Sequence, residues 1–175
     1  KFLGPESLAV FALAFTFMKF LRSFSSIIFA PFDSRYNHLI ASKNYNLLRS
    51  TLKEVILFTM PVFIFVSISI VLLSSKIVIN WSGYDYKDSA IILLFLVLNF
   101  MFSYIINSGN SILKVFVRLK EIYFINSIIV LFFWTGIYFT ISDLGIVSFA
   151  FFKFASGFIA FILFTRVLVK YLNIK

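Results

Sequence analysis

The amino-acid sequence predicts an all-α integral membrane protein, built as a bundle of about five transmembrane helices. Of its 175 residues, 61% are hydrophobic and only 13% are charged, and the mean hydropathy is +1.01. Soluble domains are about half apolar and about a quarter charged, so a soluble globular protein is excluded. The sequence also lacks the alternation of apolar and polar residues that is typical of a membrane β-barrel. We expect residues 1–175 to form a single membrane domain.

Five apolar stretches each have about the ~20 residues that a spanning helix requires. They are residues 8–30, 52–73, 90–113, 122–141 and 145–168. Pro61 lies inside the second stretch and is expected to bend that helix, because a proline within a helix removes a backbone hydrogen bond.

The first stretch is apolar enough to span a bilayer, yet it carries Lys19 and Arg22 near its middle. Two cations at that depth cost ~5–7 kcal/mol on insertion scales, which nearly cancels the ~4–7 kcal/mol contributed by the apolar residues. Small and polar residues follow one face of this helix at steps of three and four: Ala12, Thr16, Lys19, Arg22, Ser23, Ser26 and Ala30. This polar stripe predicts a helix that lines a polar cavity. The alternative is an ion pair with an acid outside this chain, because no other apolar stretch holds a deep carboxylate.

The connection that follows, residues 31–53, ends in an amphipathic segment over residues 42–54. Tyr45, Leu48 and Leu52 share one side of it and charged residues the other. We expect a short helix that lies along the cytoplasmic surface of the membrane. Asp33 is expected to cap a turn after Pro31.

The third stretch carries a second polar stripe at helical spacing: Asn99, Ser103, Asn107, Asn110 and Lys114. Carboxamides in hydrocarbon must hydrogen-bond to another helix or face water, so these residues either tie helices together or face a substrate. In the fifth stretch, Lys153 shares a face with the small residues Ser156, Gly157 and Ala160, which suits close helix packing. Lys153 is a further candidate for contact with a substrate.

The distribution of basic residues predicts the orientation. Ten lie on one side: Arg35, Lys43, Arg49 and Lys53; Lys114, Arg118 and Lys120; and Arg166, Lys170 and Lys175. Three lie on the other side: Lys1, Lys76 and Lys87. Because cytoplasmic loops are rich in Lys and Arg, we expect the N-terminus of this segment outside, in the periplasm, and the C-terminus in the cytoplasm.

Several functional classes are disfavoured. The chain has no cysteine and one histidine, which leaves no thiolate or multi-histidine metal site, and no cofactor motif is present. Acids are not paired in the apolar stretches for acid–base chemistry, so an enzyme is not expected. The basic loops are too short and dispersed for nucleic-acid recognition. Because the sequence begins without Met or a signal-peptide layout, we expect it to be part of a longer chain.

Three short patterns occur in a characteristic order. Residues 4–14 (GPESLAVFALA) open the first helix, residues 144–150 (LGIVSFA) open the last, and between them stand Pro31, Ser34, Ala41, Asn44 and Leu48. Together with the topology, they resemble a Wzx-type polysaccharide (O-antigen) flippase of the multidrug/oligosaccharidyl-lipid/polysaccharide exporter superfamily. The resemblance implies that these helices are most of the second lobe of a two-lobe transporter, whose first lobe belongs to the same chain.

The resemblance further implies a function in the bacterial inner membrane. Such a flippase moves undecaprenyl-diphosphate-linked oligosaccharide between the leaflets by alternating access, in contact with membrane lipid. Lys19 and Arg22 would then attract the diphosphate, and Asn99, Ser103 and Asn107 would bind sugar hydroxyls. One alternative is a drug or cation exporter of the same fold, which would carry an acid in a membrane helix. Another is a membrane-embedded polysaccharide polymerase or acyltransferase, which would have a large outer loop.

Overall fold

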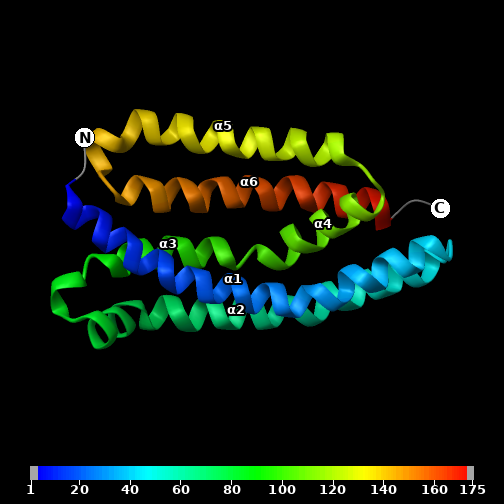
Figure 1. Ribbon diagram of the computed structural model, residues 1–175, viewed down its shortest axis with the longest axis horizontal. Coiled ribbons are helices and arrows are strands. Elements are labelled where there is room, and N and C mark those ends of the chain that lie inside the picture. The colour runs from blue at the N-terminus through cyan, green and yellow to red at the C-terminus, as the bar shows by residue number, and fades with distance from the viewer. Residues whose placement is uncertain (1–3, 173–175) are drawn as a thin grey trace.

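The computed structural model describes residues 4–172, and every element in this range is helical (Figure 1). The elements are α1 (Pro5–Ala41), α2 (Tyr45–Ser82), the 3-10 turn η1 (Tyr84–Tyr86), α3 (Ser89–Phe100), α4 (Ser103–Val115), α5 (Leu119–Leu144) and α6 (Val147–Leu172). Four helices, α1, α2, α5 and α6, are long and apolar enough to cross a membrane, and α3 and α4 together would make a fifth span. The prediction of an all-α membrane bundle is confirmed.

Helix α1 continues well past the predicted end at residue 30. Pro31 lies inside the helix and on its exposed side, and the helical backbone runs on to Ala41. An interior proline disfavours a helix by ~3 kcal/mol, so packing must compensate for it. Tyr36 and Leu39, both after the proline, are buried in the core. The turn that was expected after Pro31, with Asp33 as its cap, is therefore replaced by three further helical turns.

Helix α2 begins where a separate surface helix was expected. Asn44 caps it, since its side-chain oxygen accepts a hydrogen bond of 3.2 Å from the backbone N–H of Leu47. From there α2 runs through Pro61 to Ser82 as one helix. Leu48 and Leu52 are buried against the core rather than facing lipid. The expected surface helix over residues 42–54 is thus corrected: residues 45–54 are the first turns of a long core helix.

The third predicted span is bent by 46° between α3 and α4. No glycine or proline marks the bend. At the bend, the backbone N–H of Phe102 donates a hydrogen bond of 3.3 Å to the backbone carbonyl of Asn99, three residues earlier. This 3-10 bond interrupts the regular α-helical hydrogen bonding. Phe100 packs on Phe63 of α2 with ring centroids 4.9 Å apart, while Phe102 packs on Phe161 of α6 at 5.1 Å. The two rings anchor the bend to helices on different sides of it.

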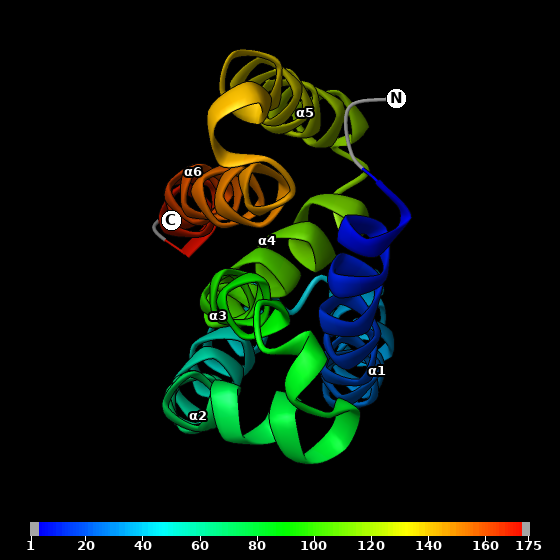
Figure 2. The same ribbon diagram turned by 90° about the vertical axis from the view of Figure 1, so that its left-hand side faces the viewer.

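The bent α3–α4 pair is the centre of the bundle. It packs against α1, α2 and α6, whereas α5 lies outside and packs mainly on α6 (Figure 2). The α1–α2 turn, the α4–α5 connection and the C-terminal part of α6 meet at one end, called the basic end below (right in Figure 1). The opposite end carries the acids Glu6, Asp85 and Asp88 around a single hollow. The three predicted basic connections are therefore neighbours in space.

Candidate functional site

The polar stripe of α1 lies uncovered on the outside of the bundle. All of its members are exposed: Ala12, Thr16, Lys19, Arg22, Ser23, Ser26 and Ala30. The hydroxyls of Thr16, Ser23 and Ser26 donate hydrogen bonds to backbone carbonyls one turn earlier in the same helix. Their hydrogen-bonding capacity is thus met locally. Lys19 and Arg22 are the members of the stripe whose charged groups are left to interact with a ligand or another chain.

Lys19 and Arg22 share one aromatic neighbour. The Lys19 Nζ lies 5.5 Å and the Arg22 Cζ lies 5.4 Å from the centre of the Phe15 ring. A cation–π contact at an exposed site contributes only ~0.5–1 kcal/mol. That is less than the ~2.5–3.5 kcal/mol that a cation costs within a membrane. Within residues 4–172, neither cation has a carboxylate oxygen within 4 Å, so their charge is not neutralised there.

Beside this stripe, a half-open cavity of about 490 Å³ lies between α1 and the α3–α4 pair, and it is called the α1–α4 cavity below. Its lining residues are Arg22, Ser25, Ser26, Phe29, Ala30 and Asp33 from α1, with Phe100, Ser103, Asn107, Asn110, Ser111 and Lys114 from the α3–α4 pair. The cavity starts at the bend and extends along α4 toward the basic end. Its size lies within the ~300–1,000 Å³ of typical ligand sites.

Two hydrogen bonds join the walls of the α1–α4 cavity. Asn107 donates from Nδ2 to the Ser25 hydroxyl at 2.8 Å, and the Ser111 hydroxyl donates to the Asp33 carboxylate. These two bonds connect α4 to α1 at positions about two turns apart on α1 and one turn apart on α4. Among the described residues, the side chains of Ser103 and Asn110 form no such bond. Both are therefore free to hydrogen-bond a ligand.

Asp33 is the site residue that sequence reasoning missed. The sequence predicts Asp33 as the cap of a turn after Pro31. In the structure, Arg22, Ser26, Ala30 and Asp33 all line the cavity, at successive steps of four, four and three along one face. The polar stripe thus continues past the proline, and this spacing was the signal available in the sequence. No three metal-ligating side chains come together within residues 4–172.

The six predicted site residues are distributed over three places. Arg22, Ser103 and Asn107 line the α1–α4 cavity. Lys153 is half-buried on α6, near enough to Arg22 for the two positive charges to act on each other. Lys19 lies on the open stripe one turn before Arg22. Asn99 lies elsewhere: its side chain packs directly on Gly157 of α6, as interhelical packing and not in the cavity.

Comparison of the chain with protein-family models, with curated proteins and with solved structures finds no match in any of the three. The class of protein therefore follows from the fold and the site alone. Four or five apolar helices make the chain a multi-pass helical membrane protein. Its distinguishing feature is a polar, predominantly cationic cavity beside the bend of its central span.

Proposed function

We propose that this chain is part of a transporter that moves an anionic, lipid-linked oligosaccharide across the bacterial inner membrane. The α1–α4 cavity would receive the diphosphate head group of an undecaprenyl-diphosphate-linked substrate. The observation that carries the proposal is the concentration of cations and neutral polar groups in one cavity between apolar helices. Polar groups within membrane spans are costly and are typical of substrate pathways.

The charges of the site favour an anion. Arg22 and Lys114 line the α1–α4 cavity against one carboxylate, that of Asp33, and Lys153 lies nearby on α6. Arg22 is the strongest candidate for phosphate contact, because a guanidinium binds phosphate through two parallel hydrogen bonds. Interactions of this kind are stronger in a medium of low dielectric constant than in water.

The neutral polar groups suit sugar hydroxyls. Ser103 and Asn110 have free hydrogen-bonding groups toward the cavity, and Asn107 adds a carboxamide beside them. A cavity of about 490 Å³ holds a head group and the first sugar, but not a whole oligosaccharide. The remaining sugars would require space contributed by the other lobe, which the resemblance to flippases places in the same chain.

The bend of 46° in the central span also supports a transporter. Discontinuous helices near the middle of the membrane commonly form substrate sites in secondary transporters, because irregular backbone there can face a cavity. Phe100 and Ser103, on either side of this bend, both line the α1–α4 cavity. The bend and the site therefore coincide.

A second candidate function is export of a drug or another cation by the same fold. Asp33 favours this second function, because a cation exporter would carry a carboxylate in a membrane helix. The apolar stretches of the sequence hold no deep carboxylate, whereas in the structure Asp33 belongs to α1 and lines the cavity. Asp33 is outnumbered by the surrounding cations, so the anionic substrate remains the first proposal.

The experiment replaces Arg22 by Gln and measures surface polysaccharide in a strain that lacks its own flippase. We expect a loss of about tenfold or more, since a hydrogen bond to a charged group contributes ~1.5–3 kcal/mol. The matched control is Lys87→Gln, at the opposite end, where the Lys87 Nζ lies 5.0 Å from the Tyr84 ring. Membrane abundance is measured for each variant, because removing a cation also eases insertion. Full polysaccharide from Arg22→Gln at normal abundance would refute the proposal.

Asp33→Asn separates the two candidates. If the substrate is an anion, removing the one carboxylate of the cavity lining leaves transport intact or improves it. If the substrate is a cation, the same change abolishes resistance to cationic dyes. Both readouts are obtained from the same strain at equal membrane abundance.

A further inference from the structure

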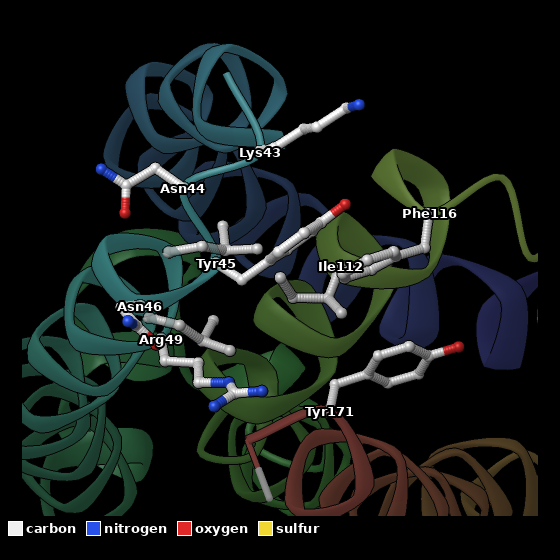
Figure 3. Close-up of a pocket in the computed structure, with 10 residues that line it drawn as sticks. Lys43, Asn44, Tyr45, Asn46, Arg49, Ile112, Phe116 and Tyr171 are labelled. Atoms are coloured by element: carbon white, nitrogen blue, oxygen red, sulfur yellow. The ribbon is translucent and has the colours of Figure 1, made fainter. Parts of the chain in front are cut away.

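A second cavity, of about 430 Å³, lies at the basic end and is called the basic-end pocket below (Figure 3). It is formed where the first turns of α2, the end of α4 and the end of α6 meet. The α1–α4 cavity shares none of its lining residues. The pocket therefore needs an explanation of its own, and the inference below does not rest on the proposed transport function.

The aromatic wall of the pocket is a stack of three rings from three helices. The Phe116 ring lies 4.9 Å from that of Tyr171 and 6.4 Å from that of Tyr45, and both pairs are nearly parallel. Tyrosines gather at the level of lipid head groups, because one end of the ring is apolar and the other is wet. The stack thus marks this end of the bundle as a membrane–water interface.

The charged side chains that line the pocket within residues 4–172 are all positive. Figure 3 shows the Arg49 guanidinium extending from α2 into the space in front of Tyr171, with Asn46 beside it and Lys43 at the rim. Among residues 4–172, no acid lines the pocket. Within residues 4–172, the ion pair at this end is Lys170–Glu121 at 3.7 Å, so Arg49 and Lys43 have no carboxylate partner. A half-buried guanidinium without a carboxylate favours binding of a phosphate.

The floor of the pocket is apolar. Leu48 and Leu52 of α2 and Ile112 of α4 line it and belong to the buried core. Cations and two amides therefore surround the mouth, while aliphatic side chains line the interior. A free phosphate would use only the mouth. An amphiphile with a phosphate head group and acyl chains matches both parts.

We propose that the basic-end pocket binds an anionic phospholipid, with Arg49 contacting the phosphate and the rings of Tyr45 and Phe116 contacting the start of an acyl chain above the apolar floor. Basic pockets between membrane helices are a recurrent setting for anionic lipid head groups. The lipid would join α2, α4 and α6 at the end where the α1–α2 pair extends beyond the other helices (Figure 1).

The test uses the full-length protein in detergent. Without a bilayer, lipid binding to the protein is measured directly and is not obscured by the surrounding membrane. Native mass spectrometry measures binding of phosphatidylglycerol, of phosphatidylcholine with the same chains, and of glycerol 3-phosphate. We expect phosphatidylglycerol to bind about tenfold more tightly than phosphatidylcholine, and Arg49→Gln to remove that preference. The matched control is Lys53→Gln, one turn further along α2, exposed and outside the pocket, which should retain the preference.

Several outcomes would overturn the proposal. An unchanged preference in Arg49→Gln would exclude Arg49 as the phosphate ligand. An equal loss in Lys53→Gln would indicate general attraction to a basic surface. Glycerol 3-phosphate binding as tightly as the lipid would exclude the acyl-chain contact. If Arg49→Gln fails to fold, Arg49→Lys replaces it: retaining the charge without the paired hydrogen bonds should lower the preference roughly threefold, and no change would contradict the proposal.

Discussion

At the scale of single residues, Gly157 allows α6 to pack on the amide of Asn99. A Cβ atom at position 157 would lie 1.6 Å from the Asn99 Oδ1 and 2.8 Å from its Cγ. Ser156 and Ala160 on the same part of α6 are buried as well. The prediction that this face of α6 suits close packing is confirmed.

We predict that Gly157→Ala lowers the stability of the bundle by ~1–3 kcal/mol, because overpacking forces the two helices apart. Thermal unfolding in detergent measures the effect. Combining it with Asn99→Ala removes the colliding amide and should restore most of the stability. Gly4→Ala serves as the control, since nothing lies within 4 Å of a Cβ there. Equal unfolding temperatures for Gly157→Ala and the unchanged protein would contradict the contact.

Part of the candidate site could be predicted from residue spacing. Arg22, Ser103 and Asn107 were singled out from the sequence, and the structure places all three around one cavity. Asn99 is different because helical spacing assumes a straight axis. The bend of 46° lies between Asn99 and Ser103, so the two side chains no longer share a face. A bend without proline or glycine leaves no mark in the sequence.

At the scale of elements, helix α1 continues through Pro31 although the proline opposes it. We predict that Pro31→Ala raises the unfolding free energy by about 1–3 kcal/mol, because it restores a backbone hydrogen bond and removes a steric clash. Pro31 is exposed, so its replacement by alanine leaves no buried gap.

The control for Pro31→Ala is Pro5→Ala. Pro5 occupies the first position of the same helix, where proline is favourable and its missing N–H has no partner to lose. No gain is expected there. A loss of stability in Pro31→Ala would mean that the segment after residue 30 is not a continuation of α1.

Hydropathy located the elements but not their ends. Each of the five apolar stretches coincides with a helix or a helix pair of the structure, because spanning segments must be both apolar and helical. The third stretch is divided between α3 and α4, and the fifth begins two residues before α6. Hydropathy detects contact with lipid, whereas packing extends helices beyond the apolar stretch. Tyr36 and Leu39 hold the end of α1, and Leu48 holds the start of α2. Because both segments contain charged residues, the sequence predicts a turn after Pro31 and a separate surface helix over residues 42–54.

At the scale of the whole molecule, the connections rich in Lys and Arg meet at one end, and Glu6, Asp85 and Asp88 lie at the other. The positive-inside rule predicts that the basic end is cytoplasmic. On this cysteine-free background, Arg118→Cys and Tyr84→Cys place single thiols at exposed positions at the two ends. An impermeant thiol reagent applied to intact cells should label Tyr84→Cys and leave Arg118→Cys unlabelled.

Permeabilised cells provide the reference for that labelling, because both thiols are accessible there. Labelling of Arg118→Cys but not of Tyr84→Cys in intact cells would reverse the orientation. The bundle itself would be unaffected by this result, since its helices pack in the same way in either orientation.

The proximity of Arg22 and Lys153 has a mechanical consequence. The two residues belong to α1 and α6, which pack on different sides of the central α3–α4 pair. Like charges repel each other, and the repulsion is larger in an apolar medium than in water. An anion between them reverses the sign of that force and draws α1 and α6 together. The charge of a group bound between Arg22 and Lys153 would therefore influence the spacing of α1 and α6.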